Sequence, residues 1–550
     1  MRISIRSIWR VMLAAGVALS ATAAEAAGHS YIPFTETLNS NGSEQGIWLA
    51  DTSNLGTPPY QITNQPLDGS TTTTVDVAIL DDWTLDPTTH LATGLVPQLL
   101  VYGTGGHLYK VNLKTIQPVS QFTNASYGQL CSLEALDERP YAATKAYVQA
   151  VVEPVGSSNT CTSGIGTQTW LIPANADNTV APTIEPTNWS VIGAFTDPTD
   201  GSFVRWIVWS GNEVDAYKAN FTGRTTLLVG PATGPAPNVL ARMDGNIVLS
   251  APNDNGTTHT DTVYHVSMTG SSVVATLSYP DSAPCPTSVG GASGSMLDPA
   301  SGIVSFADST ASGYAVYATP IGGGTATLVY NDASGIKCGG VVGDSTSGSY
   351  AGINETDITT AETRVLGVND TGPATQAPNV LADSGNGNAF VAIRYTIDGH
   401  FWIQAADFSG PTTVPSVIVA DGNGTQLQDY AGGKFGDDIW GGFSASGNAP
   451  GVERDVFYVF FANATPCTGG TLTAVDPATF VGTNISGVPA DACGALAYGW
   501  QPASVGYFLE GTGSSPIEID PVGGKAYQLL GVDPNGVFIN LANLQGYPFY

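Results

Sequence analysis

The chain has 550 residues, of which 42% are hydrophobic and only 11% are charged. Its 46 Asp and Glu outnumber its 17 Lys and Arg, so the formal net charge at pH 7 is −29. A surface this acidic repels phosphate backbones and anionic lipids, which excludes nucleic acid as an expected partner. Evenly recurring apolar runs exclude a disordered chain.

The N-terminus has the three-part layout of a secretory signal peptide. Met1–Arg10 carries three arginines, Val11–Ala23 is apolar, and Ala24–Ala26 matches a small-residue cleavage pattern. A membrane anchor is the alternative, but the apolar run is shorter than the roughly 20 residues that cross a bilayer. We therefore expect residues 1–26 to be removed. Residues 27–550 are expected to form one exported domain, periplasmic or secreted, without a membrane span.

The stretch Gly290–Asn331 contains four short apolar runs separated by Gly, Ser, Asp and Pro. The runs are Ser293–Leu297, Gly302–Ala307, Tyr314–Thr319 and Thr325–Tyr330. Their length and the alternation of side chains in the last three are typical of strands, and none is long enough for a helix. The stretch predicts a four-stranded antiparallel meander.

The same unit recurs along the chain. Three strands open it, at 31–37, 46–51 and 59–63, which is one strand short of a unit. Units follow at 75–123, 133–172, 191–229, 239–279, 293–330, 340–381, 389–430, 439–485 and 496–530. A last strand, Gly536–Leu541, is left over.

The missing strand at one end and the surplus strand at the other predict that the N- and C-terminal strands pair. Such pairing closes a ring of sheets and removes two exposed strand edges. The period of about 50 residues is near that of a propeller blade. We therefore expect an all-β propeller of repeated four-stranded antiparallel blades, seven to ten in number.

Two fragments carry a resemblance to known proteins. Gly103–Leu113 (GTGGHLYKVNL) and Gly469–Thr479 (GGTLTAVDPAT) share the pattern G-x-L-Y/T-x-V-D/N. In this they resemble generic β-propeller blades, without matching any specific family. The resemblance implies a fold and no activity.

Two other all-β architectures were weighed against the propeller. Tandem β-sandwiches have about 100 residues per domain, and outer-membrane barrels have strands of about ten residues. Most strands expected here are shorter than that. The period of about 50 residues favours the propeller.

Six cysteines form three couples that are close in the sequence. They are Cys131 with Cys161, Cys285 with Cys338, and Cys467 with Cys493. An even number of cysteines in an exported chain indicates disulfides. We expect each couple to join strands of one unit or of neighbouring units. A metal site is the weaker alternative, because no C-x-x-C pair is present.

Aromatic and acidic residues occur together at two places that are candidates for ligand binding. Asp82 lies beside Trp83, and Asp438 lies near Trp440. Trp and carboxylates can line a sugar site, and a glycosidase needs two carboxylates at a set separation. Solvated turns are the alternative interpretation.

Three loops contain patterns with a structural and a functional interpretation. Thr396–Trp402 resembles a degraded Asp-box of sialidase-type propellers, although Asp398-Gly399 is more simply a hairpin turn. Asp421–Thr425 with Asp429, and Asn253–Gly256 with Asp261, place oxygen ligands at alternate positions, as calcium loops do. Asn, Asp and Gly turns explain both loops as well. No cofactor is expected, and calcium is the only cation for which the spacing offers an argument.

The sequence contains no H-E-x-x-H motif, no P-loop and no G-x-S-x-G motif. We therefore expect a non-catalytic exported binding or scaffold protein with an unidentified extracellular or envelope ligand. A monomer is expected. The alternative is an extracellular propeller enzyme, a hydrolase or lyase acting on glycans, with Asp82 and Asp438 as candidate carboxylates.

Overall fold

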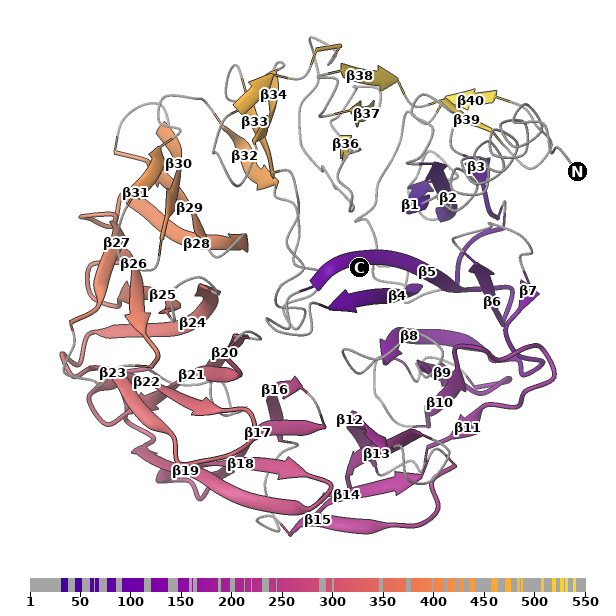
Figure 1. Ribbon diagram of the computed structural model, residues 1–550, viewed down its shortest axis with the longest axis horizontal. Coiled ribbons are helices and arrows are strands. Elements are labelled where there is room, and N and C mark those ends of the chain that lie inside the picture. Colours follow the sequence, from indigo (N-terminus) through magenta and orange to yellow (C-terminus); the bar gives the residue numbers. More distant parts are fainter. Residues whose placement is uncertain are drawn as a thin grey trace, which may run out of the picture.

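A computed structural model of the chain describes strands and turns between residues 31 and 540 (Figure 1). The described residues are 31–37, 45–51, 60–63, 65–68, 77–85, 92–112, 120–136, 147–157, 161, 166–185, 189–197, 203–211, 213–218, 220–229, 237–243, 245–285, 293–298, 301–345, 350–371, 377–397, 400–409, 414–421, 426–429, 435–440, 457–462, 470–475, 482–484, 486–487, 506–508, 517–520, 525–528, 530–532 and 538–540. Their secondary structure is strand and turn, and a search of them for a helix able to cross a membrane finds none. The expected signal peptide, residues 1–26, lies outside them.

The strands of the N-terminal half group into five sheets, numbered here in chain order. Sheet 1 contains β1 (Tyr31–Thr37), β2 (Gln45–Asp51), β3 (Tyr60–Gln61), β39 (Leu530–Val532) and β40 (Phe538–Asn540). Sheet 2 contains β4 (Val77–Leu85), β5 (Ala92–Thr104), β6 (His107–Asn112) and β7 (Ser120–Gln121). Sheet 3 contains β8 (Gln129–Leu136), β9 (Tyr147–Glu153), β10 (Gln168–Pro173) and β11 (Thr183–Ile184). Sheet 4 contains β12 (Ser190–Asp197), β13 (Phe203–Trp209), β14 (Glu213–Lys218) and β15 (Thr225–Val229). Sheet 5 contains β16 (Asn238–Met243), β17 (Asn246–Asp254), β18 (Thr258–Ser267) and β19 (Gly270–Pro280).

Five further sheets follow in the C-terminal half. Sheet 6 contains β20 (Ser293–Asp298), β21 (Ile303–Thr310), β22 (Gly313–Pro320) and β23 (Thr327–Asp332). Sheet 7 contains β24 (Lys337–Ser345), β25 (Tyr350–Asp357), β26 (Thr363–Asn369) and β27 (Asn379–Asp383). Sheet 8 contains β28 (Ala389–Ile397), β29 (His400–Asp407), β30 (Val414–Ala420) and β31 (Gln426–Asp429). Sheet 9 contains β32 (Phe435–Trp440), β33 (Phe457–Ala462), β34 (Gly470–Val475) and β35 (Gly482–Asn484), and sheet 10 contains β36 (Gly506–Phe508), β37 (Ile517–Asp520) and β38 (Lys525–Gln528).

The predicted fold class is confirmed by these sheets. Sheets 2 to 9 are four-stranded antiparallel meanders in which each strand pairs with its neighbours in sequence. In Figure 1 the sheets follow one another around a centre, with the first strand of a sheet inside and the fourth outside. This radial order is typical of a propeller.

Sheet 1 brings the two ends of the described chain together. β39 pairs with β3 in parallel through one residue pair, Tyr60 and Val532, and β40 pairs with β39 in antiparallel orientation. Sheet 1 thus has five strands, where the sequence predicted four. Closure of the whole ring stays a prediction, because a single bridging residue pair is not a ladder of hydrogen bonds.

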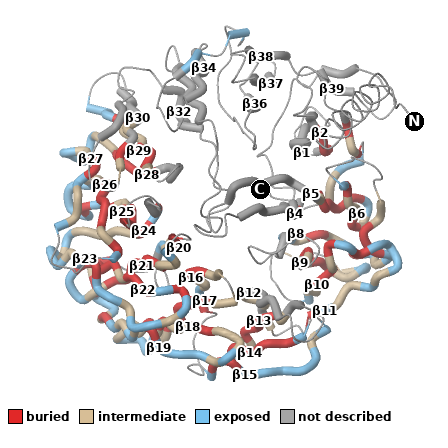
Figure 2. The backbone as a smooth tube through the Cα atoms, viewed as in Figure 1, coloured by how far each residue is buried: buried red, intermediate tan, exposed pale blue. Residues whose placement is uncertain are grey.

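The core lies between successive sheets. Val248 and Val263 of sheet 5 share one apolar cluster with Val304 and Phe306 of sheet 6. β21 of sheet 6 is buried on both of its faces, because sheets 5 and 7 cover it on either side. Figure 2 shows buried segments on the inner and middle strands, whereas the outermost strands carry many exposed positions.

A recurring β-bulge marks the repeat in sheets 4 to 7. In each of these sheets the register between the third and fourth strands shifts by one residue. The extra residue on the fourth strand is aliphatic and buried, at Leu227, Val274, Val329 and Leu381. A bulge increases local twist. Its recurrence about every 50 residues marks the same position in each of the four sheets.

Two of the three predicted disulfides are present among the described residues. Cys131–Cys161 joins β8 to the connection between β9 and β10, within sheet 3. Cys285–Cys338 joins the segment after β19 to β24, and so spans sheet 6. Disulfides of this kind are typical of proteins in an oxidising compartment outside the cytoplasm. Cys467 and Cys493 lie outside the described residues, and their pairing stays a prediction.

Candidate functional site

Titratable residues gather at one end of the strands of sheets 5 to 8. In a meander the second and fourth strands end on the same side, where the third strand and the next sheet begin. An aspartate stands at or directly after most of these ends: Asp254, Asp281, Asp332, Asp357, Asp383, Asp407 and Asp429. We call this set the aspartate rim.

Short turns fix several rim side chains. In each, the aspartate Oδ1 accepts the backbone N–H of the residue two positions later, an Asx turn. The pairs are Asp254 with Gly256, Asp332 with Ser334, Asp357 with Thr359, Asp383 with Gly385 and Asp407 with Ser409, at 2.7 to 2.9 Å. The hydroxyl groups of Thr359 and Ser409 donate hydrogen bonds to Asp357 and Asp407, respectively. These bonds hold the pKa of each carboxyl group below its usual range. The two carboxylates therefore keep their charge in mildly acidic solution.

His259 lies between two rim carboxylates on sheet 5. Its Nδ1 is 3.6 Å from Asp254 Oδ2, and its Nε2 is 3.3 Å from Asp281 Oδ1. The imidazole stacks on the ring of Tyr279, with a centroid distance of 5.3 Å. The three polar side chains are partly exposed, at 24% to 40%. Solutes in the surrounding water can therefore reach the imidazole and both carboxylates.

Two buried carboxyl groups meet deeper in the boundary between sheets 5 and 6. Asp261 is 1% exposed and Asp308 is 1% exposed. Burial, together with the neighbouring Asp261 carboxyl, raises the pKa of Asp308 to about 8. Burial also raises the pKa of Asp261. Near neutral pH the pair therefore holds a proton, because two ionised carboxylates in contact repel each other.

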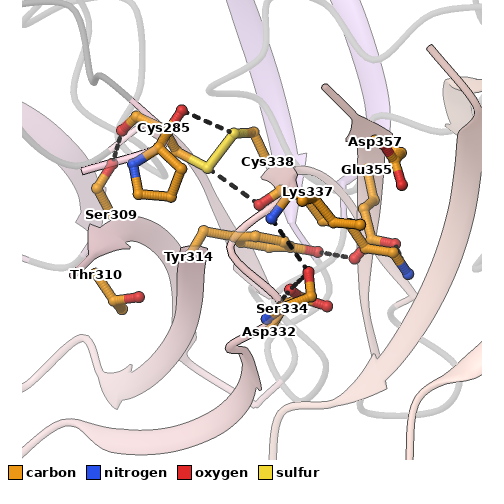
Figure 3. The surroundings of a disulfide bond; sticks show 12 residues. Cys285, Ser309, Thr310, Tyr314, Asp332, Ser334, Lys337, Cys338, Glu355 and Asp357 are labelled. Carbon is orange, nitrogen blue, oxygen red and sulfur yellow. Dashed lines mark hydrogen bonds and ion pairs between the residues drawn. A yellow bond between two sulfur atoms is a disulfide. The ribbon is translucent and has the colours of Figure 1, made fainter. Parts of the chain in front are cut away.

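An ion pair of sheet 7, between Lys337 of β24 and Glu355 of β25, is hydrogen-bonded to two tyrosines of sheet 6 (Figure 3). Glu355 Oε2 accepts hydrogen bonds from the hydroxyl groups of Tyr314, at 2.8 Å, and Tyr330, at 3.2 Å. Its Oε1 is 3.2 Å from Lys337 Nζ. Burial raises the pKa of Tyr314 above its usual value, and so does the adjacent Glu355 carboxylate. Tyr314 is therefore a hydrogen-bond donor at all ordinary pH values, and the cluster is satisfied internally.

The disulfide Cys285–Cys338 lies directly beside this ion pair (Figure 3). Ser309, near the end of β21, donates its hydroxyl hydrogen to the carbonyl oxygen of Cys285. The segment that leaves sheet 5 is thus tied both to sheet 6 and to sheet 7. This arrangement fixes the rim across three successive sheets.

A second pair of buried carboxyl groups lies at the opposite end of the strands. Asp370, directly after β26, is 3% exposed and accepts a hydrogen bond from Ser305 at 3.5 Å. Burial, with the nearby Asp298 carboxylate, raises the pKa of Asp370 to about 6. Sheet 6 is therefore flanked by two buried carboxyl pairs, each of which contains a group with a raised pKa. Asp261 and Asp308 lie toward sheet 5 at the rim end of the strands, and Asp298 and Asp370 lie toward sheet 7 at the opposite end.

The sequence-predicted aromatic and acidic pairs lie on two strands that begin their sheets. Asp82 and Trp83 are on β4, in register with Val96 and Leu95. Asp438 and Trp440 are on β32. The side chains of all four residues lie outside the described part of the chain. Their role as ligand-site candidates therefore stays a prediction.

The structure separates the residues of one calcium-loop candidate. Asn255 Oδ1 accepts hydrogen bonds from Thr257 and Thr258, and Asp254 Oδ1 accepts one from Gly256. Asp261 instead faces Asp308 between the sheets. For the other two loops, residues 422–425 and 398–399 lie outside the described residues. The turn interpretation thus accounts for Oδ1 of Asp254 and Oδ1 of Asn255 in this loop.

Sequence reasoning missed His259, Glu355 and the Asp261–Asp308 pair. The repeated strand-terminal aspartate followed two positions later by Gly, Ser or Thr was a usable signal for the rim. The contacts of Asp261 with Asp308 and of Glu355 with two tyrosines cross between sheets and left no comparable local pattern. Such contacts depend on which sheet faces approach each other.

No protein-family model matches the chain, and neither does any curated protein. Among solved structures it is similar to Porphyromonas gingivalis dipeptidyl peptidase 4, with 8% identity and a TM-score of 0.40 over 78% of this chain and 57% of that one. It is also similar to an oligogalacturonate lyase in complex with manganese, with 8% identity and a TM-score of 0.31 over 83% and 98%. A third similar structure is the Niastella koreensis GH74 enzyme, with 12% identity and a TM-score of 0.26 over 91% and 79%. The chain spans little more than half of the peptidase, and none of these similarities carries an argument for an activity.

Proposed function

We propose that this protein is an exported, non-catalytic β-propeller binding protein that recognises a cationic ligand through its aspartate rim. The observation that supports the proposal most is the series of rim carboxylates held in Asx turns at successive strand ends. Their spacing follows the repeat, so the charges form a row rather than a random scatter. The signal peptide, a single domain at 27–550, a closed ring and a monomeric state belong to the proposal.

Preorganised carboxylates are suited to binding at this surface. Each Asx turn fixes a carboxylate before a ligand arrives, which lowers the entropy cost of association. The disulfide Cys285–Cys338 ties three sheets together behind the row. A row of like charges also attracts oppositely charged partners from a distance, most strongly at low ionic strength.

Equilibrium binding of an oligolysine peptide to the mature protein tests the proposal. The variant Asp332→Asn/Asp407→Asn removes two rim charges, and Asn still accepts the hydrogen bonds of both turns. We expect its Kd to rise at least fivefold, and binding of the native protein to weaken with added salt. The control Asp421→Asn, directly after β30 at the opposite end of the strands, is expected to leave the Kd unchanged.

A panel of polysaccharides provides the opposing outcome. Turnover of any of them that is lost in Asp82→Asn or Asp438→Asn contradicts the non-catalytic role and supports the glycan enzyme instead. Equal oligolysine binding by the rim variant and the native protein contradicts the rim as the recognition surface. N-terminal sequencing of the exported protein and light scattering test the cleavage site and the monomeric state.

A further inference from the structure

Three large apolar side chains are exposed at the rim end of sheets 7 and 8. Ile336 directly precedes β24 and is 37% exposed, Ile358 follows β25 and is 52% exposed, and Phe408 follows β29 and is 55% exposed. Side chains of this kind mostly lie in the core. Single exposed apolar residues are common on protein surfaces, whereas a cluster of them marks a binding surface. The relative positions of the three side chains therefore decide how they are interpreted.

The Asx turns of the rim hold two of these side chains in the solvent. Asp357–Thr359 and Asp407–Ser409 share one pattern, in which a large apolar residue stands between an aspartate and a hydroxyl residue. In each turn the third residue donates its N–H to the aspartate Oδ1 at 2.8 Å. This hydrogen bond leaves the middle side chain outside the closed ring of the turn. The exposed apolar group is therefore a feature of the turn that recurs at the same place in both sheets.

Two equivalent backbone hydrogen bonds attach these turns to the start of their own sheets. The N–H of Ile358 donates to the carbonyl oxygen of Ile336 at 2.7 Å. The N–H of Phe408 donates to the carbonyl oxygen of Asn388 at 2.7 Å, and Asn388 directly precedes β28 as Ile336 precedes β24. Ile336 and Ile358 are therefore neighbours on the surface of sheet 7.

A close backbone contact joins the turn of sheet 7 to the segment that supports Phe408. Gly387 is the residue before Asn388, and a Cβ atom built on it would lie 2.4 Å from the carbonyl oxygen of Thr360. Thr360 belongs to the turn that begins at Ile358. The turns of the two sheets are therefore in contact through Gly387 and Asn388. We call the three exposed side chains the apolar patch: Ile336, Ile358 and Phe408.

Carboxylates border the apolar patch. Asp407 directly precedes one of its residues and is exposed, and Asp332 lies four positions before another. Hydrogen bonds from Ser409 hold the pKa of Asp407 below its usual range, so this carboxylate stays charged. Lys337 and Arg364 of sheet 7 are already paired with carboxylates. The negative charge repels an anionic lipid surface and attracts a partner that carries positive charge.

We propose that the apolar patch and its bordering aspartates bind a basic peptide segment of another protein, in which apolar side chains alternate with lysines or arginines. The inference rests on the proposed function and narrows its cationic ligand to this class, because such a segment supplies both kinds of group on one chain. Salt screens the attraction between charges but not the burial of apolar surface. Binding of such a segment is therefore expected to be less sensitive to salt than binding of a purely charged peptide.

Two fluorescein-labelled peptides of equal length and charge test the proposal with the mature protein. One is Lys-Phe-Lys-Lys-Leu-Lys, and the other, Lys-Ser-Lys-Lys-Ser-Lys, lacks the apolar groups. By fluorescence anisotropy we expect the native protein to bind the apolar peptide at least fivefold more tightly. In Ile358→Ser/Phe408→Ser this preference is expected to fall below twofold, with the affinity for the serine peptide unchanged. Both side chains are more than half exposed, so the variant is expected to keep the circular dichroism spectrum of the native protein.

Val273→Ser is the matched control. Val273 is 56% exposed and lies near the start of β19, away from the rim end, so the preference is expected to stay at its native value. Equal affinity of the native protein for the two peptides, a preference that persists in Ile358→Ser/Phe408→Ser, or an equal loss in the control overturns the inference. The proposed function fails separately, when Asp332→Asn/Asp407→Asn binds the serine peptide as tightly as the native protein does. Binding of neither peptide contradicts both.

Discussion

Asp370 of sheet 7 accepts a hydrogen bond from Ser305 of sheet 6, and both side chains are buried in the boundary between the two sheets. Burial and the nearby Asp298 carboxylate raise the pKa of Asp370 to about 6. The ordinary value in an unfolded chain is about 3.9. The folded state therefore holds more protons than the unfolded state between about pH 4 and pH 6.

The first prediction is that Asp370 makes the protein less stable as the pH rises through this window. Its contribution is fully present below about pH 4 and is lost as the pH approaches 6 and above, by up to about 3 kcal/mol. Asp370→Asn is uncharged at every pH and still accepts from Ser305, so the loss is expected to disappear. Chemical unfolding at pH 4 and pH 7 measures it as the difference between native protein and variant.

The exposed Asp407, with its lowered pKa, is the control for this comparison. Asp407→Asn is expected to leave the slope of stability between pH 4 and pH 7 nearly unchanged, because that carboxylate is ionised throughout. A slope in Asp370→Asn as steep as in the native protein would show that Asp370 does not bind a proton on folding.

The second prediction concerns the disulfide that spans sheet 6. Cys285 and Cys338 are 53 positions apart, and closing a loop of that length restricts the unfolded chain. The double variant Cys285→Ala/Cys338→Ala is expected to lose about 2 to 4 kcal/mol of unfolding free energy. Denaturant titration measures the loss. A midpoint equal to that of the native protein is the result that contradicts it.

The strands followed from the sequence where local patterns specify them. β1 spans the predicted residues 31–37, and the four strands of sheet 6 lie within a few residues of their predicted bounds. Alternating side chains and turn residues act over four to eight positions, so a single chain reveals them. β11, Thr183–Ile184, was missed because a two-residue strand has no period to detect.

The buried carboxyl pair Asp261–Asp308 and the tyrosine partners of Glu355 did not follow from the sequence, because these contacts form between sheets. Asp308 resembles any polar residue in an alternating strand, yet sheet 5 covers it completely. Glu355 of sheet 7 gains its partners from two strands of sheet 6, through Tyr314 and Tyr330, and from β24 of its own sheet, through Lys337. These contacts depend on how neighbouring sheets pack, which the pattern within one unit does not specify.

The third prediction uses a glycine at a close approach between sheets 6 and 7. Gly294 has a φ of +67° and lies in the bulge between β20 and β21. A Cβ atom there would overlap the carbonyl oxygen of Val341 on β24. Gly294→Ala is expected to destabilise the protein by about 1 to 3 kcal/mol, measured by thermal or chemical unfolding.

Gly322 is the matched control for that substitution. No heavy atom lies within 4 Å of a Cβ built there. Gly322→Ala is therefore expected to change stability by less than about 0.5 kcal/mol. Equal effects at the two positions would argue against a tight approach of β20 to β24.

The fourth prediction is that Glu355 and Lys337 stabilise the protein only as a pair. Glu355 is 2% exposed, and the Lys337 side chain is 19% exposed. Glu355→Gln keeps an oxygen for Tyr314 and leaves the Lys337 ammonium without its carboxylate, at an expected cost of about 2 to 4 kcal/mol. Lys337→Met in the same chain removes the uncompensated charge, so the double variant is expected to recover at least half of that loss. Unfolding free energies of the two single variants and the double variant form the thermodynamic cycle, and strictly additive losses would show that the two side chains do not interact.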